Sequence, residues 1–427
     1  MRRHLKRLAW ALGVIVVVLV GWIAWTARME TTAAGVPVRW LLPVSAKGSI
    51  AIPVMAATQR RIVIPGFLDG PVVKRDAGGW RARWYCEDRV HVVNGSGPTL
   101  RIACAGRTHR FDVGPPIIPA AVLPMPQRVV VLSDLEGDQR FLQAALRELD
   151  LVDGGGRWSG GATQLVVVGD SVDRGRDAFA VLWRLRDLQR EAAAAGGAVH
   201  VLIGNHEQYL LRGIGKSLHA EHRHALARLG GPATAFAAGT LIGDWLRQLP
   251  VAVRLGDTLF VHGGLSASTA SALPGVEVAN AAIRGYWLRS GATARSRALD
   301  AVLGGDGLTQ FRGAVPAEDG GPAPTSDVAV ALEAWGARRM VVGHTLVSNV
   351  QAVQGARVFA VDVAEPDLPQ AALTFVNGEP VIVPIRARRT DNKAGHGVLP
   401  ARRVDHAGLI AGTVAETRRA AAIPMPY

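Results

Sequence analysis

The most constraining stretch of the sequence is an apolar run that ends in a short charged loop, Leu165-Val166-Val167-Val168-Gly169-Asp170-Ser171-Val172-Asp173-Arg174-Gly175. A β-branched run of this length predicts a buried strand, and α/β folds place their chemistry at the C-terminal edge of such strands. Two carboxylates beside one guanidinium suit a hard cation and a phosphate, because the carboxylates bind the cation and the guanidinium grips phosphate oxygens. Taken alone, the stretch also fits a solvated loop after a core strand.

The same pattern recurs four more times, once before this stretch and three times after it. Each time an apolar run is followed by Asp, Asn or His beside glycine: Val129–Leu132 before Ser133-Asp134-Leu135-Glu136-Gly137-Asp138, Ala198–Ile203 before Gly204-Asn205-His206-Glu207, Thr258–Val261 before His262-Gly263-Gly264, and Arg339–Val342 before Gly343-His344-Thr345. A satisfied core histidine explains any one of them, but unpaired polar groups near the core cost roughly several kcal/mol each. One cation cluster explains all five, because binuclear sites need several oxygen and nitrogen ligands and a bridging carboxylate.

Helices are predicted between these strands, over Gln139–Leu149, Ala178–Ala194 and, with breaks at residues 213–215 and 230–232, up to Leu249. Strands that alternate with helices are typical of an α/β domain. The Gly-, Ala- and Pro-rich stretch Gly291–Ser326 is expected to form a loop-rich insertion over the site.

These motifs resemble those of the calcineurin-like metallophosphoesterases, within them the phosphoprotein phosphatase family, and most closely its bacterial Shewanella-like branch. The family pattern is G-D-x-H-G, G-D-x-V-D-R-G, G-N-H-E, H-G-G and a late G-H, of which the last four are matched in full and in order. The resemblance covers about Arg128 to Pro384. It implies an α/β fold with a β-sandwich flanked by helices.

The resemblance implies a metal-dependent phosphatase that hydrolyses phosphomonoesters by attack of a metal-bound hydroxide at a binuclear centre. Asp170 would bridge the two cations and Asp134 would hold the first. The second would be held by three residues from other motifs, Asn205, His262 and His344.

The same resemblance assigns the catalytic and substrate-binding residues. Arg174 would clamp the phosphate together with Asn205, and His206, oriented by Asp173, would be the general acid that protonates the leaving group. The stretch Gly307–Gly313 is similar to the G-x-x-W-[YF]-R-G stretch of the Shewanella-like branch. It nominates Arg312 as a second phosphate-binding arginine, with Arg289 as the substitute.

The first motif departs from the family because Glu136 stands where the family has histidine. A glutamate can reach the same place as a histidine, and a more anionic site favours manganese or magnesium over softer ions. We therefore predict that Glu136 is a ligand and that the cations are two Mn ions, with Mg, Fe and Zn as the alternatives. The competing expectation is a weak or empty first site.

Three functions are kept open for the enzyme domain. The leading hypothesis is a phosphatase acting on phosphomonoesters, with Ser, Thr or Tyr phosphates of proteins among the candidates. A dinucleoside polyphosphate hydrolase is the second, because a related branch has nearly the same motifs. The third is a catalytically weak or silent binding protein, and only Glu136 supports it.

The N-terminus carries an apolar run, Leu8–Ala27, of the ~20 residues that a helix needs to cross a bilayer. Basic residues precede the run and only Arg28 follows it, so residues 1–30 are predicted to be a single-pass anchor in the inner membrane. The catalytic domain would then be periplasmic or extracellular. A cleaved signal peptide, with Thr32-Ala33-Ala34-Gly35 as the cleavage region, is the alternative.

The remaining chain divides by composition into a β-rich module over 31–126, the phosphoesterase domain over 127–385 and a basic, disordered tail over 386–427. Cys86 and Cys104, the only cysteines, flank the turn Asn94–Gly97 on two hairpin arms and are predicted to form a disulfide. The net charge of +13 comes from arginines spread along the chain, so no nucleic-acid partner is expected. The histidines between Lys216 and His224 are expected on a solvated helix and not at a metal.

Overall fold

The computed structural model describes residues 67–390 except 77, 88, 289–296 and 316–324, and near the N-terminus residues 7, 10, 12–18, 28–31, 37–45 and 48–53. It divides into two compact units: residues 1–64 with 393–427, and Pro65–Asn392. The smaller unit contains an antiparallel sheet in the order β1-β2-β3, with β1 at Arg28–Thr31, β2 at Pro37–Ser45 and β3 at Gly48–Pro53.

The prediction of an N-terminal transmembrane helix is wrong. Among the residues that the structure describes, no helix is both long and apolar enough to cross a bilayer. The described part of the apolar run is helical at residue 10 and over residues 12–18, and the rest of the run lies outside the described residues. The membrane partner that was inferred from this run therefore has no support in the structure.

The larger unit begins with two small antiparallel sheets. One has the order β4-β5-β6 and the other is the hairpin β7-β8; their bounds are β4 Asp69–Asp76, β5 Gly79–Cys86, β6 Arg89–Gly95, β7 Thr99–Cys104 and β8 Arg107–Asp112. The predicted disulfide between Cys86 and Cys104 is confirmed, with 5.8 Å between the Cα atoms. The two cysteines do not lie on the arms of one hairpin as predicted. Cys86 ends β5 and Cys104 ends β7, and these strands belong to different sheets that the disulfide joins.

The core of the larger unit consists of two sheets. The first has the order β12-β11-β10-β18-β19 and the second the order β16-β17-β15-β14-β13-β9. The strands are β9 Val122–Leu123, β10 Arg128–Leu132, β11 Gln164–Val167, β12 Ala198–Val201, β13 Ala252–Leu255, β14 Thr258–Val261, β15 Arg339–Val342, β16 Gln351–Val353, β17 Val358–Ala360, β18 Ala371–Val376 and β19 Glu379–Pro384. The five strands that carry the sequence motifs are all present, three in the first sheet and two in the second.

Aromatic side chains pack the two sheets against each other. Phe375 on β18 lies edge-on to Phe260 on β14, with 6.2 Å between ring centroids, and to Phe359 on β17, with 6.1 Å. All three rings are buried, and the facing strands are almost wholly apolar, as expected of strands covered on both faces. The predicted α/β fold with a flanked β-sandwich is confirmed.

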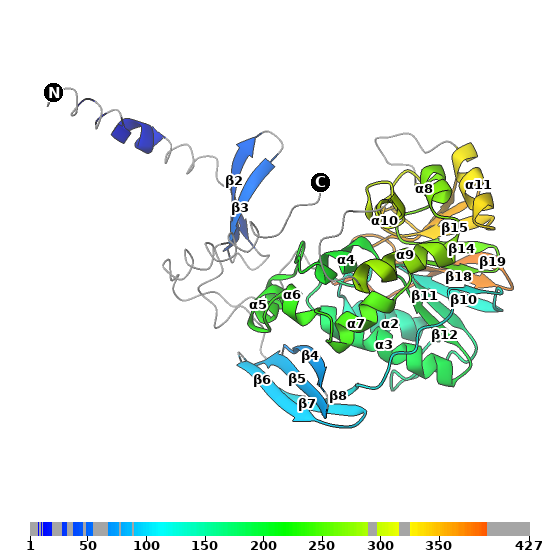
Figure 1. The fold of residues 1–427 in the computed structure, drawn as a ribbon, viewed down its shortest axis with the longest axis horizontal. Helices are drawn as coiled ribbons and strands as arrows, with labels where there is room; N and C mark the ends of the chain where they lie inside the picture. The colour runs from blue at the N-terminus through cyan, green and yellow to red at the C-terminus, as the bar shows by residue number, and fades with distance from the viewer. Residues whose placement is uncertain are drawn as a thin grey trace. The chain divides into compact units, whose positions relative to one another are not determined.

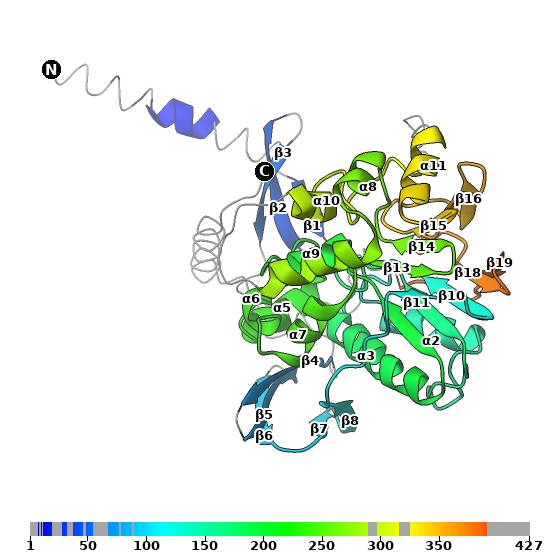
Figure 2. The ribbon, with the colours of Figure 1, turned by 45° about the vertical axis from the view of Figure 1, so that its right-hand side comes forward.

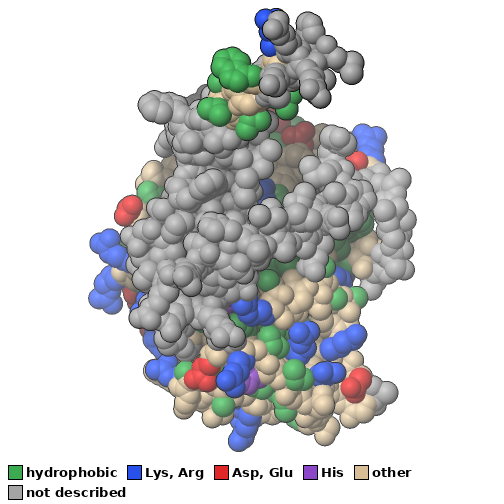
Figure 3. Space-filling view, turned by 90° about the vertical axis from the view of Figure 1, so that its left-hand side faces the viewer, with side chains coloured by type: hydrophobic (Ala, Val, Ile, Leu, Met, Phe, Trp, Pro, Cys, Tyr) green, Lys and Arg blue, Asp and Glu red, His purple; other side chains and the backbone are tan. Residues whose placement is uncertain are grey.

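Helices cover the outer faces of this sandwich. They are α2 Gln139–Glu148, α3 Ala178–Ala194, α4 Asn205–Leu211, α5 Ala220–Arg228, α6 Pro232–Ala235, α7 Leu241–Gln248, α8 Ala267–Ala272, α9 Val276–Leu288, α10 Arg297–Leu303 and α11 Thr325–Ala334. In Figures 1 and 2 the strands of the two sheets lie between α2 and α3 on one side and α8 and α11 on the other. On the described surface in Figure 3, Lys and Arg side chains are spread among other types, in keeping with the net charge of +13.

The small sheets pack on helix α3 of this core. The Trp183 indole donates to the carbonyl of Pro71, 3.1 Å away, and Arg186 donates to the carbonyl of Asp112 at 2.7 Å. The strands β4–β8 therefore belong to the same compact unit as the two-sheet core.

The prediction of a disordered tail from residue 386 does not hold for residues 386–390. The main-chain N–H groups of Arg386 and Ala387 donate to Glu148 on α2, at 2.7 and 2.9 Å. Sequence periodicity could not reveal this segment, because it is held by single polar contacts and not by an apolar face. The rest of the predicted tail lies outside the described residues.

Candidate metal centre and active site

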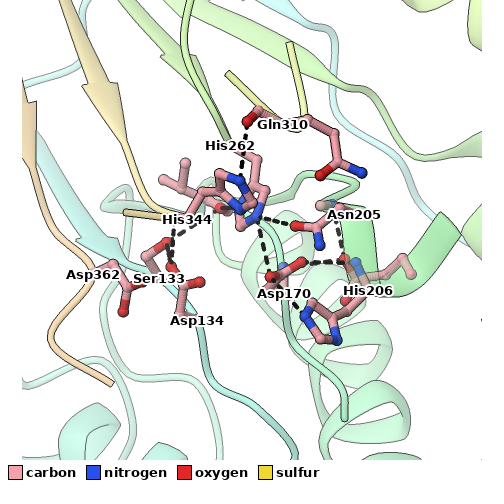
Figure 4. Close-up of polar contacts among 12 residues, drawn as sticks. Ser133, Asp134, Asp170, Asn205, His206, His262, Gln310, His344 and Asp362 are labelled. Atoms are coloured by element: carbon pink, nitrogen blue, oxygen red, sulfur yellow. Dashed lines mark hydrogen bonds and ion pairs between the residues drawn. The ribbon is translucent and has the colours of Figure 1, made fainter. Parts of the chain in front are cut away.

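Parallel strands bring the motif residues to one edge of each sheet. Strands β10, β11 and β12 are parallel neighbours, so Asp134, Asp170 and Asn205 follow strands that end at the same edge. Strands β14 and β15 are parallel in the second sheet and place His262 and His344 at its corresponding edge. Figure 4 shows these side chains converging from both sheets.

Three of the predicted ligands form a compact donor group. One ligand atom each from Asp170, His262 and His344 lies within 4.8 Å of the others, and all three residues are buried. Asn205 adds an oxygen, with its Oδ1 3.0 Å from Nε2 of His262. A carboxylate, an amide oxygen and two imidazoles are a donor set that suits a divalent transition-metal ion.

Main-chain carbonyls orient both imidazoles toward this group. His262 uses Nδ1 to contact the carbonyl of Val168 at 2.8 Å, which leaves its Nε2 3.1 Å from Asp170. His344 uses Nε2 to contact the carbonyl of Gln310 at 3.1 Å, which leaves its Nδ1 for a cation. Ligating histidines usually donate their other ring nitrogen in this way. The residues present therefore fit a metal.

The close packing of charged groups shifts their protonation. Burial disfavours a charge on His262, but the Asp170 carboxylate outweighs burial and raises the pKa of His262 to about 10. Burial, followed by the charge of neighbouring His262, lowers the pKa of His344 to about 3. Burial, followed by the Asp362 carboxylate, raises the pKa of Asp134 to about 8.

The backbone of the motif loops is strained where it approaches the site. Asp134, Asp170 and His344 have φ values of 49°, 48° and 62°, in the left-handed region that residues with a Cβ seldom occupy. Gly204 cannot carry a side chain, because a Cβ there would lie 2.2 Å from Oδ1 of Asp170. Strain of this kind is typical of functional sites.

Glu207 is a positioning residue to which the sequence analysis gave no role. Its buried carboxylate accepts main-chain N–H groups from Gly204 at 2.8 Å, Asp170 at 3.1 Å and Ser171 at 2.7 Å. It thereby joins the loop after β11 to the start of α4. The sequence signal that could have indicated this role is the place of Glu207 as the last residue of the G-N-H-E motif.

His206 and Asp173 form a buried pair beside the metal centre. Nδ1 of His206 lies 2.8 Å from Oδ2 of Asp173, and Nε2 of His206 lies 3.7 Å from Asp170. Burial disfavours the imidazolium, but Asp170 and then Asp173 outweigh burial and raise the pKa of His206. The histidine can therefore hold a proton as a general acid needs to.

Replacing Asp173 by Asn is expected to move the alkaline limb of the pH profile to lower pH. A general acid works only while protonated, so activity falls as the pH rises through the pKa of His206. The Asp173→Asn substitution would remove a charge that raises this pKa. The profile of kcat/KM against pH measures the shift, and a limb at the wild-type position would contradict the role of Asp173.

The predicted ligands of the first cation are less closely grouped. Oδ2 of Asp134 accepts from Ser133 Oγ at 2.5 Å and from the His344 N–H at 3.3 Å. Glu136 is buried and its carboxylate forms an ion pair with Arg174, whose side chain is half-exposed. The structure thus places Glu136 against the predicted phosphate clamp.

Asp362 was missed by the sequence analysis. It follows the buried strand β17, which is parallel to β15, and its carboxylate lies beside Asp134 and Ser133 in Figure 4. Burial raises the pKa of Asp362. The signal was present as an apolar run, Val358–Val361, that ends in an acidic residue, but without a flanking glycine it did not match the other motifs.

Arg312, one of the two arginines nominated from the sequence, contacts the main chain of a predicted ligand, and Tyr209, which was not predicted, contacts His206. Arg312 is exposed and donates to the carbonyl of His344 at 2.8 Å, while Arg289 lies outside the described residues. Tyr209 lies edge-on to His206, with ring centroids 5.6 Å apart, and its hydroxyl accepts from Lys216 at 3.1 Å.

The expectation of a solvated histidine helix is wrong. His219, His222 and His224 are all buried, and Nδ1 of His222 lies 2.7 Å from Oδ2 of Asp69 on β4. The sequence could not reveal this partner, because it is 153 residues away.

Comparison with known families agrees with this geometry. A sequence model of the calcineurin-like phosphoesterases matches residues 127–348, more than half of the chain. The chain belongs to this family. Membership makes the protein a hydrolase of the phosphoesterase class and implies divalent metal ions, for which the Asp170–His262–His344 group supplies ligands.

Relatives within the calcineurin-like family include two kinds of curated enzyme. The chain is 43% identical over 82 residues to Shewanella-like protein phosphatase 2 of Arabidopsis thaliana, covering 19% of this chain and 21% of the relative. It is 31% identical over 183 residues to the symmetrical bis(5'-nucleosyl)-tetraphosphatase of a Janthinobacterium species, covering 42% of this chain and 53% of the relative. The chain thus spans about a fifth to a half of these relatives.

A solved calcineurin-like structure is similar over a longer stretch. The cold-active protein-tyrosine phosphatase of a psychrophilic Shewanella species has a TM-score of 0.68 and 27% identity to this chain. The similarity covers 75% of this chain and 100% of that one. The resemblance to the Shewanella-like branch is therefore confirmed.

Proposed function

We propose that the protein is a metal-dependent phosphatase that hydrolyses phosphomonoesters at a binuclear centre. The observation that carries the proposal is the position of Asp170. Its carboxylate lies 3.1 Å from His262 in the donor group and 3.7 Å from Nε2 of His206. One side chain thus joins a metal-ligand set to a general acid.

The predicted residues divide into those that hold cations and those that handle the substrate. Asp170, Asn205, His262 and His344 would hold one cation, and Asp134, Glu136 and Asp170 the other. Bound there, divalent cations lower the pKa of water and neutralise charge that develops on phosphoryl oxygens. Arg174 would bind the phosphate through its half-exposed guanidinium, with Asn205 and Arg312 as further contacts.

His206 would then complete the reaction by protonating the leaving oxygen from Nε2. Asp173 holds Nδ1 and so fixes which nitrogen faces the substrate. The ring is almost fully buried, which keeps bulk water from competing for the proton. Among the candidate metals we propose manganese, because the donor set is rich in oxygen.

Phosphoserine, phosphothreonine or phosphotyrosine of proteins are the proposed substrates, in keeping with the names of two relatives in the Shewanella-like group. The test is hydrolysis of p-nitrophenyl phosphate and a phosphopeptide panel by the full chain with Mn²⁺ and with a chelator. We expect turnover with Mn²⁺ and its loss with the chelator. A protein that binds cations without hydrolysing any phosphoester would be a binding protein instead.

A dinucleoside tetraphosphatase is the second candidate, and the bis(5'-nucleosyl)-tetraphosphatase relative favours it. The same assay separates the two when diadenosine tetraphosphate is included. Activity confined to the dinucleotide would replace the phosphatase proposal.

Replacing Glu136 by Gln is expected to reduce the number of bound cations from two to one. The glutamine side chain is isosteric but loses the anionic charge that a first-site ligand supplies, while the donor group around His262 is left intact. Metal analysis of the purified variant with saturating Mn²⁺ measures the number. Two bound cations would leave Glu136 only as the ion-pair partner of Arg174.

A further inference from the structure

A short segment beyond the family match contacts the loop that carries Asp134. The family match ends at residue 348, and residues 386–390 follow the last strand, β19. The segment is fixed at both ends: Arg386 and Ala387 bind Glu148 near the end of α2, as described above. Thr390 binds Asp138, the N-cap of α2, through its N–H at 2.6 Å and its hydroxyl at 3.0 Å.

Arg389 points inward from this segment. Its Nη1 donates to the carbonyl of Asp134 at 2.5 Å, and its Nη2 donates to the carbonyl of Ser133 at 3.2 Å. The guanidinium also lies 4.1 Å from the centre of the buried Phe141 ring. Arg389 is 9% exposed, so its side chain is buried among these groups.

The third contact of Arg389 leads to the loop after Asp362. Its Nε donates to Oε1 of Gln370 at 3.0 Å. The amide nitrogen of Gln370 in turn donates to three carbonyls of the loop that follows Asp362, those of Val363 at 2.9 Å and of Glu365 and Leu368 at 3.0 Å. One guanidinium therefore ties the loop that carries Asp134 to the loop that follows Asp362.

The charge of Arg389 matters as much as its hydrogen bonds. The guanidinium interacts electrostatically with the buried carboxylates of Asp134, Asp138 and Asp362. Buried carboxylates that lie together repel each other unless a cation compensates them. The main chain of Asp134 is also in the strained left-handed region, which persists only where its surroundings hold it.

We propose that Arg389 is a positioning residue for the first cation site. It holds the main chain of Asp134 so that the carboxylate keeps its direction before a cation arrives. The inference rests on the proposed binuclear centre. Arg389 touches neither the substrate nor the reacting atoms, so its effect is on cation affinity at one site and not on the chemical step.

The test compares Mn²⁺ binding to full-length Arg389→Gln, Arg389→Lys and wild type by titration calorimetry. Arg388→Gln is the matched control, because it removes the same charge from the exposed neighbouring residue. We expect the first-site affinity of Arg389→Gln to fall at least about tenfold, with the second site unchanged, Arg389→Lys intermediate and Arg388→Gln like the wild type. At saturating Mn²⁺ the kcat of Arg389→Gln should return toward the wild-type value.

Two results would overturn the inference alone, and a third would overturn it together with the binuclear proposal. Equal affinities in Arg389→Gln and wild type would exclude a positioning role. Weakening of both sites in step with a lower Tm, with no rescue by lysine, would make Arg389 a general stabilising residue. A wild type that binds fewer than two cations would refute the binuclear proposal itself and the inference with it.

Discussion

Asp170→Asn should lower kcat on p-nitrophenyl phosphate by about 10³-fold or more, which is ~4 kcal/mol of transition-state stabilisation. Asparagine has the same shape but no charge, so it cannot bridge two cations. The Asp170 carboxylate also accepts the main-chain N–H of His206 at 3.0 Å. Its replacement therefore weakens the metal-ligand set and the placement of the general acid together.

Steady-state kinetics and metal analysis of the same Asp170→Asn preparation measure this prediction. Both activity and bound cations should fall. Asp187→Asn is the matched control, since Asp187 is a partly buried aspartate on α3 that contacts none of the motif residues described above. Near-normal turnover by Asp170→Asn with two bound cations would show that this carboxylate does not bridge them.

The second large effect is expected for His206→Asn, and it should depend on the leaving group. An alkoxide leaves poorly without a proton, so kcat/KM for an alkyl phosphate such as O-phosphoserine should fall roughly 10²–10⁴-fold, the usual worth of a general acid. p-Nitrophenolate leaves readily without a proton, so its phosphate ester should lose much less activity. The substituted asparagine cannot donate the proton in either case.

The comparison of the two substrates separates this role from a loss of structure. A general defect in folding or cation binding would lower both rates by the same factor. His109→Asn serves as the control, because His109 lies on β8 in the small hairpin. Equal losses for both esters in His206→Asn would contradict the assignment of His206 as the general acid.

Local motifs allowed much of the site to be predicted from sequence. Asp170, Asn205, His262 and His344 each follow a buried strand, and parallel strands that end at one edge bring such residues together whatever lies between them. Helix α3, Ala178–Ala194, was predicted with the bounds that the structure shows, because the apolar pattern begins and ends abruptly at these residues.

Contacts between distant and individually unremarkable residues could not be predicted. Buried His222 contacts Asp69, which lies 153 residues away in the sequence. Arg389 contacts the main chain of Asp134, which lies 255 residues away. Neither Asp69 nor Arg389 belongs to a periodic sequence pattern that would indicate such a contact. The membrane prediction from the apolar N-terminal run failed for another reason. Hydropathy shows only that a segment could span a membrane, and no helix among the described residues is long and apolar enough to do so.

The central claim, two cations sharing Asp170, is tested most directly by anomalous diffraction from crystals of the full chain grown with Mn²⁺. We predict two manganese peaks, one contacted by His262, His344 and Asn205 and the other by Asp134, with the Asp170 carboxylate touching both. An enzymatically active crystal with no peak between Asp170 and His262 would contradict that claim.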